Sequence, residues 1–165
     1  MRQNQTVFAN FICKFGEADM LDYAENVVLP AFTDDTLVRA YGDSSMHFFE
    51  VFLGEADGDA VVAGKFIHNT KIHRTHRFVE GRGQIEDRAT LETAPSAFFV
   101  LFLSNHRLIY FAETSHAPEI GTFRNTIERF IRSKYERFIR AERRRLSRPV
   151  HELRSKNCTN ASRNP

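Results

Sequence analysis

The 165-residue sequence contains no tryptophan and only two cysteines, Cys13 and Cys158. Cys13 lies in an apolar run and Cys158 in a polar terminus, so the pair does not indicate a disulfide framework. No run approaches the roughly 18 apolar residues that span a bilayer. The first apolar stretch is too short and too interrupted for a signal peptide. We therefore expect a cytoplasmic protein without a disulfide scaffold.

Familiar catalytic motifs are also absent. The sequence has no Walker A loop, no Gly-x-Gly-x-x-Gly and no Gly-x-Ser-x-Gly elbow. His73 and His76 have no cysteine nearby, and strand alternation sends them to opposite faces, so we expect no metal site and no cofactor. A nuclease would need clustered carboxylates, whereas Glu86 and Asp87 fall in an expected loop. A non-enzymatic protein is favoured, and a metal-dependent nuclease is the enzyme alternative.

The near-neutral total charge of +2 hides a split along the chain. Residues 1–118 hold 10 Lys/Arg and 16 Asp/Glu, a net charge of −6, and residues 119–165 hold 13 Lys/Arg and 5 Asp/Glu, a net charge of +8. An acidic body joined to a basic C-terminal segment suggests an anionic partner for that segment.

The apolar pattern predicts one α+β domain over residues 1–146. Sixteen phenylalanines supply a large apolar core without polar atoms to satisfy. We expect a mostly antiparallel sheet of about five strands near residues 6–15, 46–53, 60–79, 97–103 and 107–113. A helix over 17–29, ended by Pro30, and a long helix over 119–146 pack on it. Residues 80–95 are expected to form a loop with room for a short strand, and the polar residues 147–165 a disordered tail.

The long helix is the strongest feature of the sequence. Its length of about 42 Å overhangs so small a domain. Its apolar positions follow one helical face and include a stripe that a twin subunit or a partner helix would cover: Phe123, Ile127, Phe130, Phe138 and Ile139. This stripe suggests a non-enzymatic interaction subunit that homodimerises or docks a partner through the helix, which is the alternative to the leading hypothesis that the basic side of the helix binds nucleic acid.

The helix is also rich in arginine, which binds phosphate in a bidentate manner better than lysine does. The candidate nucleic-acid-binding positions on it are Arg124, Arg132, Lys134, Arg137, Arg140, Arg143, Arg144 and Arg145. Three other interpretations stay open: a solvated charged face, docking on the protein's own acidic body or a dimer mate, and an anionic membrane surface.

A second basic segment lies in the expected strand 60–79. On strand alternation Lys71, His73 and Arg77 share one face, and His68, Arg74 and His76 share the other. The first set is expected to extend the nucleic-acid footprint. An exposed edge strand protected by charge is the alternative.

Residues 96–131, SAFFVLFLSNHRLIYFAETSHAPEIGTFRNTIERFI, place an apolar strand before a turn and a second strand that ends in Phe111-Ala112. A polar connection over 113–118 and a helix with a hydrophobic face follow. This arrangement resembles the N-terminal domain of RexA-type phage-exclusion proteins. The resemblance implies a bacterial or phage cytoplasmic protein of phage defence that binds DNA without strong sequence preference and self-associates, so DNA is favoured over RNA as the nucleic acid. That family has a further domain after the helix, where this sequence ends.

Overall fold

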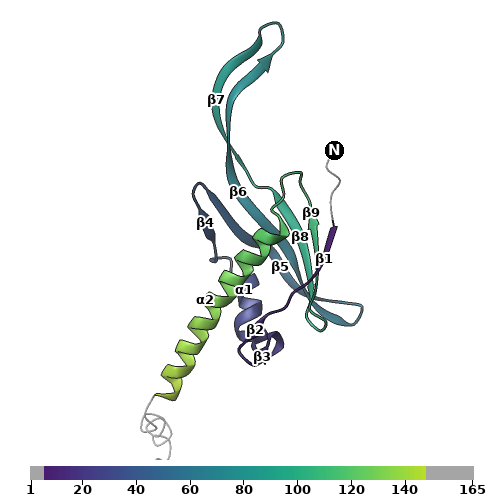
Figure 1. Ribbon diagram of the computed structural model, residues 1–165, viewed down its shortest axis with the longest axis vertical. Helices are drawn as coiled ribbons and strands as arrows, with labels where there is room; N and C mark the ends of the chain where they lie inside the picture. Colours follow the sequence, from purple (N-terminus) through teal and green to yellow (C-terminus); the bar gives the residue numbers. More distant parts are fainter. Residues whose placement is uncertain (1–5, 148–165) are drawn as a thin grey trace, which may run out of the picture.

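The computed structural model of the protein describes residues 6–147. One antiparallel sheet contains β1 (Thr6–Asn10), β4 (Arg39–Tyr41), β5 (Ser44–Ala56), β6 (Asp59–Val79), β7 (Gly83–Thr93), β8 (Ser96–Phe102) and β9 (Arg107–Ala112). The strand order is β1-β9-β8-β6-β5-β4, with β7 paired to β6 alone (Figure 1). The α+β class with a mostly antiparallel sheet is confirmed, and the sheet has seven strands rather than about five.

The helix expected over residues 17–29 is wrong in its bounds and its type. A small hairpin of β2 (Lys14–Phe15) and β3 (Ala18–Asp19) comes first, followed by a 3-10 turn η1 (Met20–Tyr23), a π-helical turn η2 (Ala24–Val28) and α1 (Leu29–Thr33). Pro30 does not end the helix; it occupies the first turn of α1. A proline is tolerated there because its missing N–H needs no partner within the helix.

Strand β6 is long enough to pair with one set of strands in the main sheet and with another strand beyond it. Residues Val61–Ile67 pair with β8 inside the sheet, while Thr70–Val79 pair with β7 in a two-stranded arm that projects beyond it (Figure 1). The expectation of a loop with room for only a short strand over residues 80–95 is therefore wrong, because most of that segment is the 11-residue strand β7. Ile85, Ala89 and Leu91 of β7 do alternate with polar residues, but Asp87 interrupts this pattern, and Gly81 and Gly83 near the start of the strand suggest a loop.

Helix α2 (Ile120–Leu146) lies across one face of the sheet, as the sequence predicts. Its Phe123 is 1% exposed, with its ring 5.3 Å from the rings of Phe99 and Tyr110 and 5.5 Å from that of Phe66. Phe32 of α1 lies in the same cluster, 5.4 Å from Phe99. Both helices therefore pack on this inner face, and aromatic rings fill the layer between them and the strands.

A β-bulge in β5 depends on a glycine in β6. Phe49 pairs with Lys65 and Phe52 pairs with Ala63, so Glu50 and Val51 together oppose Gly64. Glu50 adopts a left-handed φ of 49°. A Cβ on Gly64 would lie 2.9 Å from the Cα of Val51. Only glycine lets the two backbones approach this closely.

We expect Gly64→Ala to lower the free energy of unfolding by about 1–3 kcal/mol, because the added methyl group forces the bulge apart. Urea denaturation measures the change. Gly121→Ala is the matched control, since nothing lies within 4 Å of a Cβ at that position in the first turn of α2. Equal stability of the two variants would contradict the close approach at Gly64.

The expected tail 147–165 falls, from residue 148 on, outside the described residues, as does Cys158. None of the helices within residues 6–147 combines the length and the apolar character that crossing a membrane requires.

Candidate nucleic-acid interface

The N-terminal half of α2 is fixed to the sheet by polar contacts as well as by its apolar face. The buried Tyr110 hydroxyl donates a 2.6 Å hydrogen bond to the carbonyl of Pro118, just before the helix begins. Burial raises the pKa of this hydroxyl, so it remains a donor. Thr126 is fully buried, and Nη1 of Arg39 on β4 donates to its Oγ1 over 3.0 Å. These contacts fix the N-terminal half of the helix on the sheet, so that the side of α2 opposite the sheet faces solvent.

The apolar stripe proposed as a partner interface does not serve that role over most of its length. Phe123, Ile127 and Phe130 are 1–3% exposed because they form the core between α2 and the sheet. Phe138 packs on Tyr23 at 5.8 Å between ring centres, and Ile139 is half-buried. The prediction of an interaction surface is therefore wrong at Phe123, Ile127 and Phe130, because the protein's own core already covers these three side chains.

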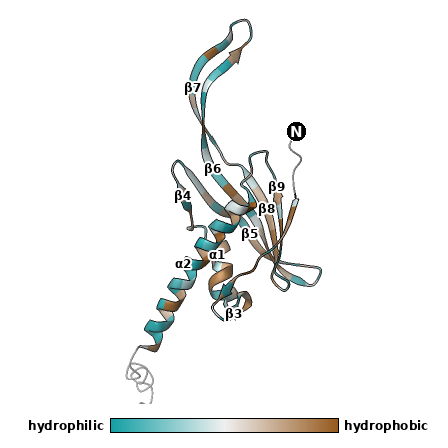
Figure 2. Cartoon of the chain, in the orientation of Figure 1, coloured by the Kyte–Doolittle hydropathy of each residue, from teal (hydrophilic) through white to brown (hydrophobic). Residues whose placement is uncertain are grey.

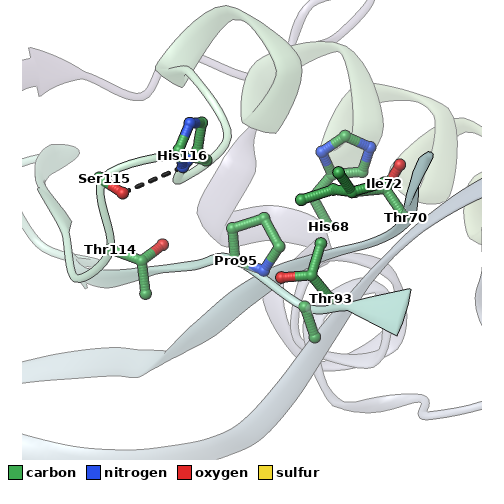
Figure 3. Close-up of a pocket in the computed structure, with 9 residues that line it drawn as sticks. His68, Thr70, Ile72, Thr93, Pro95, Thr114, Ser115 and His116 are labelled. Atoms are coloured by element: carbon green, nitrogen blue, oxygen red, sulfur yellow. Dashed lines mark hydrogen bonds between the residues drawn. The ribbon is translucent and has the colours of Figure 1, made fainter. Parts of the chain in front are cut away.

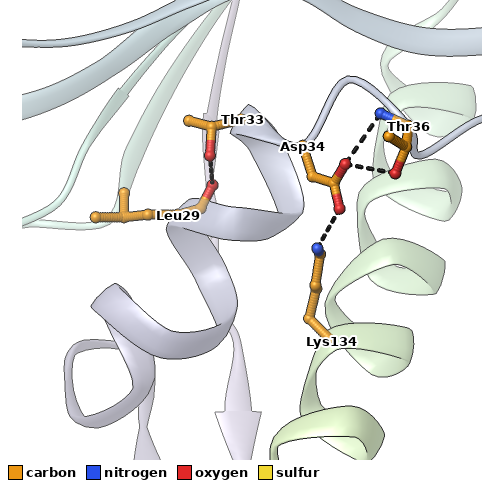
Figure 4. Close-up of polar contacts among 5 residues, drawn as sticks. All are labelled: Leu29, Thr33, Asp34, Thr36 and Lys134. Atoms are coloured by element: carbon orange, nitrogen blue, oxygen red, sulfur yellow. Dashed lines mark hydrogen bonds and ion pairs between the residues drawn. The ribbon is translucent and has the colours of Figure 1, made fainter.

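Lys134 is also removed from the list of phosphate-binding candidates. Its ammonium group donates to the carboxylate of Asp34, which follows α1 and also accepts hydrogen bonds from the backbone N–H and the hydroxyl of Thr36 (Figure 4). The Lys134 side chain is 14% exposed. Its hydrogen bond to Asp34, together with the two from Thr36, lowers the pKa of the carboxyl to about 2. This ion pair fastens α1 to α2.

We expect Asp34→Asn to lower the free energy of unfolding at pH 7 by about 1–3 kcal/mol, the range for hydrogen bonds to charged groups. The wild-type contribution is complete above the ordinary carboxyl pKa near 3.8 and is lost as pH falls toward 2. Chemical denaturation between pH 7 and pH 2 should therefore show the two stability curves converging below pH 4. A constant difference across that range would contradict the ion pair.

The arginines of α2 do not dock on the acidic body. Within residues 6–147 their ion pairs stay inside the helix: Arg132 to Glu128 at 3.1 Å, Arg140 to Glu136 at 3.6 Å and Arg145 to Glu142 at 3.7 Å. All three arginine side chains are 71–77% exposed, and exposed pairs of this kind contribute little. In the described part of the chain, Lys134–Asp34 is the sole ion pair between α2 and another element.

Four of these arginines form what we call the outward arginine face. Arg129, Arg132, Arg140 and Arg143 are separated by three, eight and three residues, so they align on the side of α2 opposite the core. Arg137, Arg144 and Arg145 surround the exposed end of the helix, which extends beyond the sheet (Figure 1). Arg124 lies apart from this face, in a cavity of about 380 Å³ lined also by Phe11, Cys13 and Glu128.

Two arginines of this surface were missed as candidates. Arg39 and Arg129 line a shallow hollow of about 470 Å³ together with Asn125, Glu128 and Arg132. The three- and four-residue spacing along the helix is a signal that identifies Arg129. Arg39 has no such signal, because only the fold brings β4 beside a helix that begins about 80 residues later.

The basic residues of the arm are arranged differently from the prediction. Arg74 and Arg77 were expected on opposite faces, yet both bind Asp87, at 2.5 Å and 3.5 Å. A bulge between Arg74 and His76 disturbs the alternation and explains the difference. His73 lies 3.2 Å from the hydroxyl of Thr90, and Lys71 is exposed. Because the arm and the exposed end of α2 point away from each other (Figure 1), these residues do not extend the outward arginine face.

A cavity of about 410 Å³ lies at the base of the arm. It is lined by His68 and Thr70 of β6, by Thr93 of β7 and by Thr114, Ser115 and His116 of the loop before α2 (Figure 3). Ser115 and His116 share a 3.0 Å hydrogen bond, but both are exposed, and within the described residues no carboxylate is hydrogen-bonded to the imidazole. Residues 6–147 contain no group of three or more His, Cys, Asp or Glu side chains placed to hold a metal. The nuclease alternative thus has no ligand cluster in this part of the chain.

The comparisons with protein-family models, with characterised proteins and with solved structures give no match to this chain.

Proposed function

We propose that the protein binds nucleic acid without sequence preference through the outward arginine face and the exposed end of α2. The observation that supports this most is that the arginines of α2 face solvent, whereas the one lysine of the helix, Lys134, forms an ion pair with Asp34. An exposed row of guanidinium groups on a rigid helix is suited to phosphate oxygens, which it contacts without reading bases.

The dimensions of the surface agree with a phosphate backbone. Arg129 and Arg143 are 14 residues apart, or about 21 Å along the helix axis. That distance corresponds to about six nucleotides of one DNA strand at 3.4 Å each. The end of the helix, residues 137–146, has five arginines and one glutamate, so the local field attracts a polyanion even though the whole chain is nearly neutral.

An anionic membrane fits this surface less well. A basic helix that lies on lipid inserts its apolar side into the headgroup layer. In α2 that side is buried against the sheet at Phe123, Ile127 and Phe130. The basic side alone is available, which favours a polyanion over a lipid surface.

Fluorescence anisotropy with two unrelated 30-base-pair duplexes tests the proposal. The two dissociation constants should agree within about threefold at the same salt concentration, because phosphate contacts contain no sequence information. The dissociation constants for 30-nucleotide single-stranded DNA and RNA, measured in the same way, show which type of nucleic acid the protein binds most tightly. Absence of binding to all of these probes at 50 mM salt would overturn the proposal.

The resemblance of residues 96–131 supports a further proposal, that this binding serves phage exclusion. The segment corresponds to β8, the turn, β9 and the start of α2. Expression of the chain in a bacterial host should then lower the plating efficiency of a susceptible phage, and replacement of the arginines at the end of α2 should restore it. An equal plating efficiency with and without the chain, over a panel of phages, would contradict a role in phage exclusion.

A further inference from the structure

The outer face of the sheet, turned away from α1 and α2, is apolar. Cross-strand register places Phe8, Ile109, Val100, Ala63 and Phe52 in one row that crosses β1, β9, β8, β6 and β5. The adjacent row contains Phe111, Phe98, Lys65 and Phe49. Figure 2 shows hydrophobic stretches along β1, β8 and β9. An antiparallel sheet with one face in water normally alternates apolar and polar residues, which this one does not.

None of these residues belongs to the core beneath the helices. The apolar residues packed against that core include Val7 and Ala9 of β1 but not Phe8 between them. Phe8 is 76% exposed, Phe52 54% and Phe49 50%. Within the described residues, no helix or strand covers this face. Phe8, Phe49 and Phe52 are therefore exposed in the single chain, and the other large apolar side chains of the two rows are half-buried.

We infer that a second copy of this chain covers the outer face in a two-fold symmetric, sheet-on-sheet dimer. A phenylalanine has about 150–250 Å² of surface, so Phe8, Phe49 and Phe52 together expose about 350 Å². The half-buried Phe98, Val100 and Ile109 enlarge that patch. A stable interface takes about 800 Å² from each partner, and the three phenylalanines alone provide nearly half of it.

Charge on and around the face indicates which surface covers it. Glu50 and Lys65 neutralise each other at 3.0 Å, so the rows contain no unpaired charge within the described residues. Around the face, the hairpin between β5 and β6 carries Glu55, Asp57 and Asp59, against the single basic residue Arg107 in the next row, so the border is acidic on balance. An acidic border repels anionic lipid, whereas an uncharged apolar sheet matches another such sheet packed about 10 Å away.

Residues 148–165 of the chain are a poor match for this face. Residues 148–165 contain only Val150 and Leu153 as large aliphatic side chains, among five Lys, Arg and Glu residues. So polar a segment does not replace water favourably over an apolar sheet. A second outer face is the complementary surface, because a two-fold contact presents the same patch from both copies.

Sedimentation velocity of the full chain at 1–100 µM measures the mass of the species. The wild type should sediment at twice the 19.1 kDa chain mass. Phe8→Lys and, separately, Phe52→Lys should raise the dimer dissociation constant at least about 100-fold, because each substitution buries a charge twice in a symmetric interface. Both positions are more than half exposed, and circular dichroism establishes that each variant folds.

Phe78→Lys is the matched control, since Phe78 is 78% exposed but lies on the arm. Its dimer dissociation constant should equal that of the wild type. A wild type that stays monomeric at 100 µM would overturn the inference, as would dimers that persist in both outer-face variants. Binding of the monomer to neutral or anionic vesicles, abolished by Phe8→Lys, would assign the face to lipid instead and equally overturn it.

Discussion

Replacing Arg143, Arg144 and Arg145 together by glutamate should weaken binding to a 30-base-pair duplex at least about 100-fold at 100 mM salt. Three attractive contacts at the exposed end of α2 become three repulsive ones, and phosphate contacts supply nearly all of non-specific affinity. These side chains are exposed and lie beyond the last buried residues of the helix. Fluorescence anisotropy measures the change, and thermal unfolding should show no large loss of stability.

A second triple variant separates the helix from overall charge. Lys14, Arg82 and Arg107 are exposed and lie on β2, the tip of the arm and β9. Their replacement by glutamate changes the net charge by the same amount, and we expect it to weaken binding by less than about tenfold. Equal losses in the two triple variants would show that net charge, and not the arginines of α2, governs the affinity.

Phe123→Ala should lower the free energy of unfolding by about 3–5 kcal/mol, the range for removing a fully buried phenylalanine. The ring of Phe123 lies 5.3–5.6 Å from the rings of Phe48, Phe66, Phe99 and Tyr110. The cavity left behind would loosen α2 from the sheet. Urea denaturation followed by circular dichroism measures the loss.

Phe78→Ala provides the comparison, because this phenylalanine is 78% exposed on the arm and should change stability by less than about 0.5 kcal/mol. If Phe123→Ala were equally mild, α2 would not be fixed by the aromatic core. The outward arginine face would then lack a rigid support, and the proposed interface would lose its basis.

The parts of the fold predicted from the sequence are those with a strong apolar period. The three- and four-residue spacing of Ile120, Phe123 and Ile127 predicted α2, and its end at Leu146 is confirmed. The continuous apolar run near residues 97–103 predicted β8 and its hairpin with β9. In these segments a single buried face determines both the sequence pattern and the structure.

The parts that could not be predicted depend on partners distant in sequence. Strand β7 pairs only with the outer half of β6, and its alternation of apolar and polar residues is broken by Asp87, so the strand could not be recognised with certainty from its own residues. The ion pair between Lys134 and Asp34 and the contact between Arg39 and Thr126 join residues about 90–100 positions apart. The sequence alone therefore predicted a phosphate-binding role for Lys134 and, in the alternative hypothesis, a partner-binding role for Phe123. Both side chains instead hold the helix to the rest of the protein.

The dependence of affinity on salt tests the proposed interface most directly. We expect log Kobs for a 30-base-pair duplex to fall linearly with the logarithm of the NaCl concentration between 50 and 300 mM. With about four to six phosphates contacted by the arginines of α2, the slope should be about −4 to −5. In the Arg143/Arg144/Arg145→Glu variant the slope should be shallower by about two to three. A wild-type slope near zero, or one that the substitutions leave unchanged, would contradict phosphate binding by α2.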